Sequence, residues 1–499
     1  RPFVATSFVP KEQVELVAEG SEDAGIVEED ILKATEVDQD QVAEEEEIMR
    51  TETKLDRSIV PPLGPDPELA IPSLWKDETT NGMKVYGINY TELPLVQYNI
   101  VMTGGRLFDD IKKPGVANMV GQLMNEGTAN KTPEELEEEI ELLGANINIY
   151  SRGSSTTISV NALARNYEKT LALVQEMLLE PRWDEEEFAL AKTSVINGIK
   201  RSKANPNYLA SSTFNELVYG KDHIYAYDAS GTIESVESIT IDDLKAYYKA
   251  YFSPSIARFH IVGDISKDQV MSSLSSLNES WEPKEVNLPE FSSPEGPESS
   301  KIYFVDVPGA KQSVIQIGYL ALARPDKDYF PATVMNYKLG GSFNSVVNMI
   351  LREEKGFTYG ARSSFSGSLL PGPFKASSSV RSNATFESVQ IFKESMENYR
   401  NGLSDDDLKF TKDALIKSNA RRFETMYALL GMLNTISTYG LADDYIMTEE
   451  EFIKNLTYDQ HKELAQKYIV PNMMYYVVAG DAATQLEPLK ELGLGDPIL

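Results

Sequence analysis

The sequence predicts an α+β protein made of two duplicated domains. Three observations support this prediction. The 499 residues are too many for one hydrophobic core, helical and strand-like patterns alternate along the chain, and one long segment occurs twice. The composition, with 41% apolar and 25% charged residues, is that of a globular protein.

The repeated segment is the strongest sign of duplication. Residues 242–264 read DDLKAYYKAYFSPSIARFHIVGD, and residues 459–481 read DQHKELAQKYIVPNMMYYVVAGD. Both predict a helix, a proline stop, a β-rich strand and a Gly-Asp turn. Four landmarks recur at one offset of 217 residues without a gap: Tyr251 and Tyr468, Pro254 and Pro471, Gly263 and Gly480, and Asp264 and Asp481. Self-similarity at a fixed spacing indicates duplicated units.

The first repeat contains most of the clear secondary-structure signals. Alternating or β-branched runs predict strands, and apolar residues at helical spacing predict helices. The expected strands are 83–86, 95–102 and 156–163, and the expected helices are 115–124, 133–143, 167–179, 185–202 and 241–251. Thr132 is the expected N-cap of the second of these helices, with Pro133 in its first turn.

Composition predicts where the domains begin and end. Residues 1–67 read as an N-terminal strand and an acidic, proline-rich linker, in which the acidic run 44–47 indicates a solvated connector rather than a binding site. The first domain is expected over 68–283 and the second over 301–499. The polar Pro/Ser/Glu segment 284–300 is the expected linker between them.

Charge and cysteine content exclude several classes of function. The formal charge of −30 argues against nucleic acid as a partner, and no apolar run approaches the ~20 residues of a membrane helix. The sequence has no cysteine, which fits an oxidising periplasm or cell envelope, although drift is the alternative. The first residue is Arg1, so we expect a processed or truncated chain.

The first predicted helix matches a known motif at its flanking positions but not at its functional positions. Residues 115–128 read GVANMVGQLMNEGT. The frame resembles the zinc motif HxxEH of the pitrilysin/insulinase metallopeptidases, or inverzincins, and matches it at Gly115, Ala117, Gly127 and Thr128. The resemblance covers about residues 70–499 and implies a mixed antiparallel sheet with helices packed on it in each domain.

The zinc-binding positions of that motif hold unsuitable residues. Asn118 and Gln122 stand where the family has its histidine ligands, and Gly121 stands where it has the glutamate base. Carboxamides are weak zinc ligands and glycine cannot accept a proton. The third ligand, a glutamate in the family, corresponds to Gly198. We therefore expect no metal in this chain, and none of its three histidines is expected to replace a ligand.

A second family motif is present in the second domain. Residues 339–345 read LGGSFNS and residues 352–361 read REEKGFTYGA. The resemblance implies that Arg352 and Tyr359, seven residues apart, reach into the zinc site of an HxxEH half. There the guanidinium would hold a substrate carbonyl or carboxylate, and the phenol would donate to an oxyanion. The alternative is that the motif persists only as a helix end with a glycine cap.

Two further expectations come from the resemblance. Strand 156–163 aligns with the edge strand on which the family binds extended peptides, although an ordinary sheet edge is the alternative. Residues 1–60 are interpreted as the tail of a preceding, zinc-bearing half.

The function expected from the sequence is that of a non-catalytic subunit or C-terminal half of a zinc metallopeptidase. It would form a heterodimer with an HxxEH partner that carries the zinc, enclose peptide substrates, and contribute Arg352 and Tyr359. The alternative is a pseudopeptidase that serves as a scaffold or peptide-binding component of an envelope complex. An autonomous peptidase with another mechanism is disfavoured, since the chain has no cysteine and no G-x-S-x-G elbow.

Overall fold

The fold is taken from a computed structural model, which describes residues 55–56, 58–59, 68–292 and 294–499. The chain divides into two units, residues 1–64 and 65–499, and the second holds both sheets. The expected strand at 1–10 and the acidic run 44–47 lie outside the described residues. No helix in the described part of the chain is both long and apolar enough to cross a membrane.

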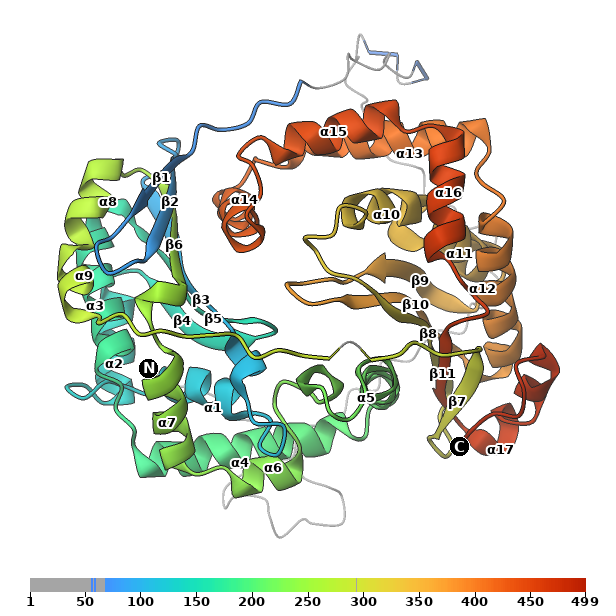
Figure 1. The fold of residues 1–499 in the computed structure, drawn as a ribbon, viewed down its shortest axis with the longest axis horizontal. Coiled ribbons are helices and arrows are strands. Elements are labelled where there is room, and N and C mark those ends of the chain that lie inside the picture. Colours follow the sequence, from blue (N-terminus) through green and yellow to red (C-terminus); the bar gives the residue numbers. More distant parts are fainter. Residues whose placement is uncertain (1–54, 57, 60–67, 293) are drawn as a thin grey trace, which may run out of the picture. The chain divides into compact units, whose positions relative to one another are not determined.

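The first half is built on a six-stranded mixed sheet in the order β1-β2-β6-β3-β5-β4 (Figure 1). Strands β2 and β6 run parallel, and all other neighbours are antiparallel. The strands are β1 (Trp75–Glu78), β2 (Lys84–Asn89), β3 (Leu95–Thr103), β4 (Asn146–Arg152), β5 (Ser155–Leu163) and β6 (Ala257–Gly263).

The five helices expected in the first half begin and end within a residue or two of their predicted limits, and four more helices described there were not predicted. Thr132 caps its helix in a reciprocal box: its hydroxyl accepts from the Glu135 N–H, and the Glu135 carboxylate accepts from the Thr132 N–H. The longer helices are α1 (Val116–Leu123), α2 (Pro133–Leu142), α3 (Tyr167–Leu179), α4 (Glu185–Ser202), α5 (Pro206–Tyr219), α6 (Ile233–Ser238), α7 (Ile241–Tyr251), α8 (Lys267–Ser273) and α9 (Ser275–Ser280). Short turns are η2 (Gly105–Phe108), η3 (Ala164–Asn166), η4 (Ile224–Ala226) and η5 (Pro254–Ile256).

The second half repeats the same topology in a five-stranded sheet ordered β7-β11-β8-β10-β9. Strands β7 and β11 are parallel, as β2 and β6 are. Lys84 and Lys301, which begin β2 and β7, are again 217 residues apart. The strands are β7 (Lys301–Asp306), β8 (Gln312–Leu322), β9 (Thr358–Phe365), β10 (Gly372–Arg381) and β11 (Tyr475–Gly480). The predicted duplication and α+β class are confirmed.

The helices of the second half include two π-helical turns, η6 (Tyr337–Gly341) and η7 (Met349–Glu354). The α-helices are α10 (Tyr329–Asn336), α11 (Val346–Asn348), α12 (Thr385–Tyr399), α13 (Asp405–Ser418), α14 (Met426–Tyr439), α15 (Tyr445–Asn455), α16 (Tyr458–Tyr468) and α17 (Ala482–Gln485). Short turns are η8 (Ser382–Ala384), η9 (Asn419–Arg421) and η10 (Pro488–Leu492). Segments 284–292 and 294–300 contain no helix or strand, while the predicted domain boundaries stay predictions.

The two halves exchange one helix with each other. Helix α14 of the second half packs on β6, β2 and β3 of the first sheet, where its leucines and methionines meet Ile88 and Val262. Helix α5 of the first half packs on β11 and β8 of the second sheet, where Phe214 and Val218 meet Val477 (Figure 1). Burying one fully apolar side chain contributes roughly 1.5–3 kcal/mol, so each exchanged helix is a strong link between the halves.

A buried histidine lies in the contact between α14 and the first sheet. His260 on β6 is fully buried, and its Nδ1 and Nε2 atoms each lie 2.6 Å from an oxygen, Asn99 Oδ1 and Ser437 Oγ respectively. Burial, and to a smaller extent the nearby Arg258, lowers the pKa of His260 to about 3. The imidazole is therefore neutral at neutral pH. Both ring nitrogens of His260 are engaged inside the fold, one with each half of the protein.

We expect acid to weaken this contact. A histidine with a pKa near 6.5 in the unfolded chain binds a proton below that pH, whereas native His260 does so only near pH 3. Between pH 6 and pH 4 this difference should lower the free energy of unfolding by about 1.4 kcal/mol per pH unit. Urea unfolding of the wild type and of His260→Gln at both pH values measures it, because the variant should lose less stability on acidification.

His223 and His461 also contribute to the acid sensitivity of the fold. Burial lowers the pKa of each to about 4, so both contribute acid sensitivity that remains in the variant. Equal pH dependence in the wild type and the variant would show that His260 is not held neutral.

Candidate functional site

The positions of the degenerate zinc motif lie on α1, whose start is held by a carboxylate. Asp109 accepts hydrogen bonds from the backbone N–H groups of Gly115 and Ala117, at 2.9 and 2.8 Å. Burial raises the pKa of Asp109 to about 7, against these two bonds, which lower it. Gly115 adopts a φ of 109°, a left-handed conformation that suits glycine, immediately before the first helical residue.

Asn118 and Gln122 face the same side of α1, as residues four apart on a helix do. The Gln122 Nε2 atom donates to Asn118 Oδ1 at 2.7 Å, and both side chains are half-buried. The amide pair therefore satisfies part of its own hydrogen-bonding capacity. The family has two imidazoles here that would converge on zinc.

Gly121 is required by the packing of α1 against the sheet. A Cβ atom at this position would lie 3.0 Å from the Ser151 nitrogen and 3.1 Å from the Tyr150 Cα on β4. These are backbone atoms of a strand and cannot rotate away. A side chain at position 121 would therefore require α1 and β4 to move apart by a few tenths of an ångström.

The fourth motif position, Gly198, lies on α4, which packs against α1. A Cβ atom there would meet nothing within 4 Å, so the missing carboxylate leaves space rather than a clash. Among the described residues, no group of three or more His, Cys, Asp or Glu side chains is placed to hold a metal ion. The residues present at the motif positions do not fit zinc.

The strand at the free edge beside α1 is β4, not the strand that the sequence predicted. Residues 156–163 belong to β5, which pairs with β3 on one side and β4 on the other, so the edge-strand prediction is wrong. The sequence reading missed β4, although Ile147 and Ile149 alternate there with polar residues. Once β4 forms, β5 becomes an inner strand.

An asparagine side chain occupies part of this edge. Asn125, just after α1, accepts from the Ile149 N–H at 2.9 Å and donates to the Ile149 carbonyl at 2.8 Å. This is the bonding that an added peptide strand would make at the same residue. In the second half, Asn348 likewise accepts from the Ala361 N–H on the edge strand β9, at 3.1 Å. Helix-borne asparagines therefore hold both edges.

Arg352 and Tyr359 lie on the surface of the second half. Arg352 is on the π-helical turn η7, a rare conformation often found at functional sites. Its guanidinium pairs with the adjacent Glu353 at 3.2 Å and lies 4.7 Å from the ring centroid of Phe343. Tyr359 is the second residue of β9 and is 90% exposed. Phe343 belongs to the first part of the same motif and was not singled out from the sequence. It is 57% exposed and contacts Arg352.

Arg352 and Tyr359 do not contact each other. Among the described residues, no hydrogen bond, ion pair or ring contact links Arg352 with Tyr359, or either of them with α1. The Tyr359 hydroxyl has no hydrogen-bond partner in the described part of the chain. Their expected role at a partner's zinc site stays a prediction.

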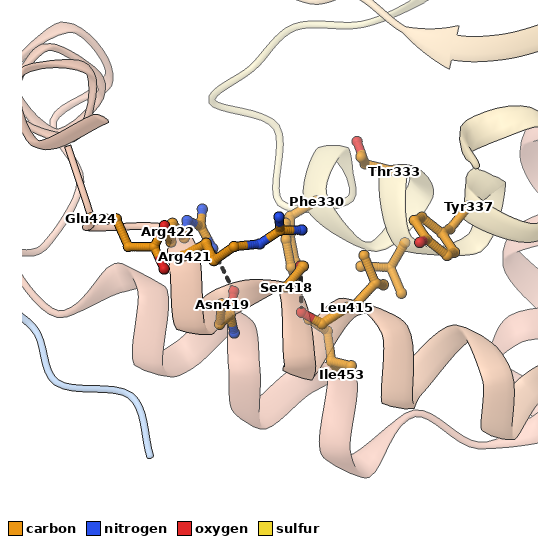
Figure 2. Close-up of a pocket in the computed structure, with 11 residues that line it drawn as sticks. Phe330, Thr333, Tyr337, Leu415, Ser418, Asn419, Arg421, Arg422, Glu424 and Ile453 are labelled. Atoms are coloured by element: carbon orange, nitrogen blue, oxygen red, sulfur yellow. Dashed lines mark hydrogen bonds between the residues drawn. The ribbon is translucent and has the colours of Figure 1, made fainter. Parts of the chain in front are cut away.

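A separate pocket of about 580 Å³ lies between α10, α13, η9 and α15. Figure 2 shows Arg421 and Arg422 at one end and Tyr337 at the other. Arg422 already pairs with Glu449 at 2.8 Å, and none of the predicted site residues lines the pocket. It offers no set of acid, base and nucleophile for catalysis.

Comparison with known domain families decides the identity of the fold. The insulinase (peptidase family M16) domain matches residues 88–225, and the peptidase M16 inactive domain matches residues 238–415. The chain belongs to the M16 insulinase family. The resemblance read from the motif frames is therefore confirmed.

Known M16 proteins cover most of this chain. The "Non-peptidase homolog YmxG" of Helicobacter pylori is 22% identical over 395 residues, 78% of this chain and 90% of that protein. The "Uncharacterized zinc protease YmxG" of Bacillus subtilis is 22% identical over 283 residues, 56% of this chain and 67% of that protein. A crystal structure of a peptidase M16 inactive domain from Pseudomonas fluorescens is 26% identical with a TM-score of 0.77, covering 83% of this chain and 99% of that one.

The two glycines of the motif should respond in opposite ways to a methyl group. Gly121→Ala should lower the free energy of unfolding by about 1–2 kcal/mol, because the added Cβ overpacks α1 against β4. Gly198→Ala should raise it by about 0.5–1 kcal/mol, because alanine favours the helix and has open space there. Chemical denaturation of both variants is the measurement. If the two changes have the same sign, the close approach at Gly121 is not what fixes this residue.

Proposed function

We propose that this M16 protein is the non-catalytic subunit of a two-part zinc peptidase. It would pair with an HxxEH subunit that carries the zinc, enclose peptides with it, and supply Arg352 and Tyr359 to the partner's site. The observation that carries the proposal is the exposed Tyr359 with its unpartnered hydroxyl, on the strand that follows the π-helical turn bearing Arg352.

The arrangement of side chains on α1 supports the proposal that the chain alone has no peptidase activity. A peptidase of this kind needs a metal-bound water and a base to activate it. Asn118 and Gln122 bond to each other, and Gly121 packs against β4 where the base would stand. The H. pylori relative is named a non-peptidase homologue and the P. fluorescens structure an inactive domain, which supports the same conclusion here.

Tyr359 and Arg352 have chemistry that a zinc site in a partner would use. A phenol can donate to the oxyanion that forms when water attacks a peptide carbonyl. A guanidinium can hold a carbonyl or a C-terminal carboxylate through two parallel N–H groups. Neither side chain is buried in the fold of its own half, so the packing of the core does not explain them.

A second candidate function is that of a scaffold without a part in catalysis. Asn125 favours it, because its amide occupies the backbone groups of Ile149 at the edge where an extended peptide would otherwise add. In that case the chain would serve as a structural or peptide-binding component of an envelope assembly. We place either assembly in the periplasm or cell envelope, because a chain of 499 residues without cysteine suits an oxidising compartment.

Activity of the reconstituted pair separates the two candidates. The protein is purified from its source, the HxxEH subunit that co-elutes with it is identified, and the pair is reassembled with Tyr359→Phe or Arg352→Gln. For the catalytic role we expect kcat for a reporter peptide to fall about 100-fold with either change, as when an oxyanion donor is removed. Pairing itself should persist, since both residues are exposed.

Matched surface changes control for a general effect of substitution. Tyr427 is 80% exposed on α14, and Arg165 is exposed after β5, so Tyr427→Phe and Arg165→Gln should leave kcat unchanged. Full activity of the Tyr359 and Arg352 variants would reject the catalytic role and support the scaffold. Failure of any HxxEH protein to co-elute would reject the heterodimer itself.

A further inference from the structure

Acidic residues are almost absent from the two sheets of this acidic protein. The formal charge of the chain is −30, with 77 Asp and Glu residues. Strands β2 to β6 and β8 to β11 nevertheless contain no Asp or Glu, and β7 contains only Asp306 at its end. The other strand carboxylates are Asp77 and Glu78 on β1, an outer strand of the first sheet, and most of the remaining ones lie on helices and loops. Whatever contacts the sheets therefore meets a local charge unlike that of the whole molecule.

Two cations lie side by side on one face of the second sheet. Side chains alternate along a strand, and Ala361, Ser363, Phe374 and Ala376 point to the buried core. Arg362 on β9 and Lys375 on β10 point to the opposite face. The register pairs Arg362 with Ser377 and Lys375 with Ser364, so the two cations are diagonal neighbours on that face.

The face around them is polar and partly uncovered. Ser364 on β9 and Ser377 on β10 point the same way, and neither is fully buried. Helix α5 covers β8 and β11 and reaches Lys375 through Phe214, whose ring centroid lies 5.8 Å from the ammonium. Lys375 is half-buried at the border of the covered area, whereas Arg362 is exposed.

Nothing in the fold neutralises these charges. Among the described residues, no carboxylate pairs with Arg362 or Lys375 and neither donates a hydrogen bond. Burial, followed by the charge of Arg362, lowers the pKa of Lys375. Two like charges at diagonal positions of a sheet repel each other through space, more weakly than a directly opposite pair would. The pair weakens the free protein, and a bound anion would reverse that effect.

We propose that the Arg362 and Lys375 face of the second sheet binds a carboxylate carried by a peptide. This proposal rests on the proposed function, in which the chain holds peptides. It adds that the preferred peptides are acidic. A peptide fits better than nucleic acid, because a net charge of −30 repels a polyphosphate while one carboxylate needs only these two cations.

The occupant lies across the face rather than extending the sheet. The outward backbone of β9 is engaged at two places, since the Ala361 N–H donates to Asn348 and the Ser363 carbonyl accepts from Asn336. The carboxylate belongs either to an Asp or Glu side chain or to the C-terminus of the peptide. Both present the same group to the guanidinium and the ammonium.

The test uses three labelled decapeptides of one neutral sequence and fluorescence anisotropy on the full chain. The first has a central Glu and an amidated C-terminus, the second has Gln and an amidated C-terminus, and the third has Gln and a free C-terminus. We expect the first or the third to bind about fivefold more tightly than the second at low salt, and the preference to shrink as salt rises. Which of the two is preferred identifies the source of the carboxylate.

The double variant Arg362→Gln with Lys375→Met should lose that preference. Methionine keeps the contact with Phe214, and the repulsion between neighbours is removed, so its melting temperature should not fall below that of the wild type. Arg165→Gln removes one positive charge elsewhere and should keep the preference. Equal binding of all three peptides, or a preference that survives in the double variant, would overturn this inference alone. Binding of none of them would overturn the peptide-holding function and this inference with it.

Discussion

The reciprocal exchange of α5 and α14 is the constraint on which the rest of this structure depends. Each sheet buries one face against helices of its own half and part of the other face against a single helix from the opposite half. The apolar residues of α14 form one buried cluster with Ile88 and Val262 of the first sheet, and the neutral His260 bonds to Ser437 on α14. The halves are therefore coupled energetically although their sheets are separate. The exchanged helices also determine what remains uncovered: β8 and β11 lie under α5, Lys375 on β10 lies at the border of α5, and Arg362 on β9 is exposed.

The motif positions on α1 are taken up by packing and by hydrogen bonds within the fold, whereas the position on α4 is not. Gly121 allows α1 to approach β4, and the amides of Asn118 and Gln122 bond to each other. Asn125, one turn beyond, ties the same helix to the edge of β4. Restoring a metal site would require a glutamate where strand backbone lies 3.0 Å from the first side-chain atom. Gly198 differs, because it retains the space that its missing side chain would fill. The degeneration has thus made the structure depend on Gly121 but not on Gly198.

Most of the local structure was predictable from sequence, and the arrangement between distant segments was not. Helices α1 to α4 and α7 and strands β3 and β5 occur within a residue or two of their predicted limits, because periodicity and caps are local signals. Strand β4 was missed because its three asparagine and serine positions weaken β propensity despite the alternation of Ile147 and Ile149. The motif frames identified the family and its degenerate positions. They could not show that β5 is an inner strand, that Asn125 occupies the edge, or that α14 covers the opposite sheet, since each depends on contacts across long separations in sequence.

The distribution of surface charge bears on which partner and which peptides the proposed subunit would bind. Under the proposed function, a subunit without a metal contributes to a peptidase only through its surfaces. In this chain those surfaces differ in the sign of their charge. Helices and loops carry the carboxylates, whereas the exposed or half-buried sheet positions carry Arg362 and Lys375 without counter-ions. Neighbouring like charges are not retained for stability, since they reduce it. A partner with a basic surface would be steered toward the acidic exterior, while an acidic segment of peptide would be favoured at the cationic face. Under the proposed function, a partner and a peptide would therefore meet surfaces of opposite charge, and neither contact would involve the motif positions Asn118, Gly121 and Gln122.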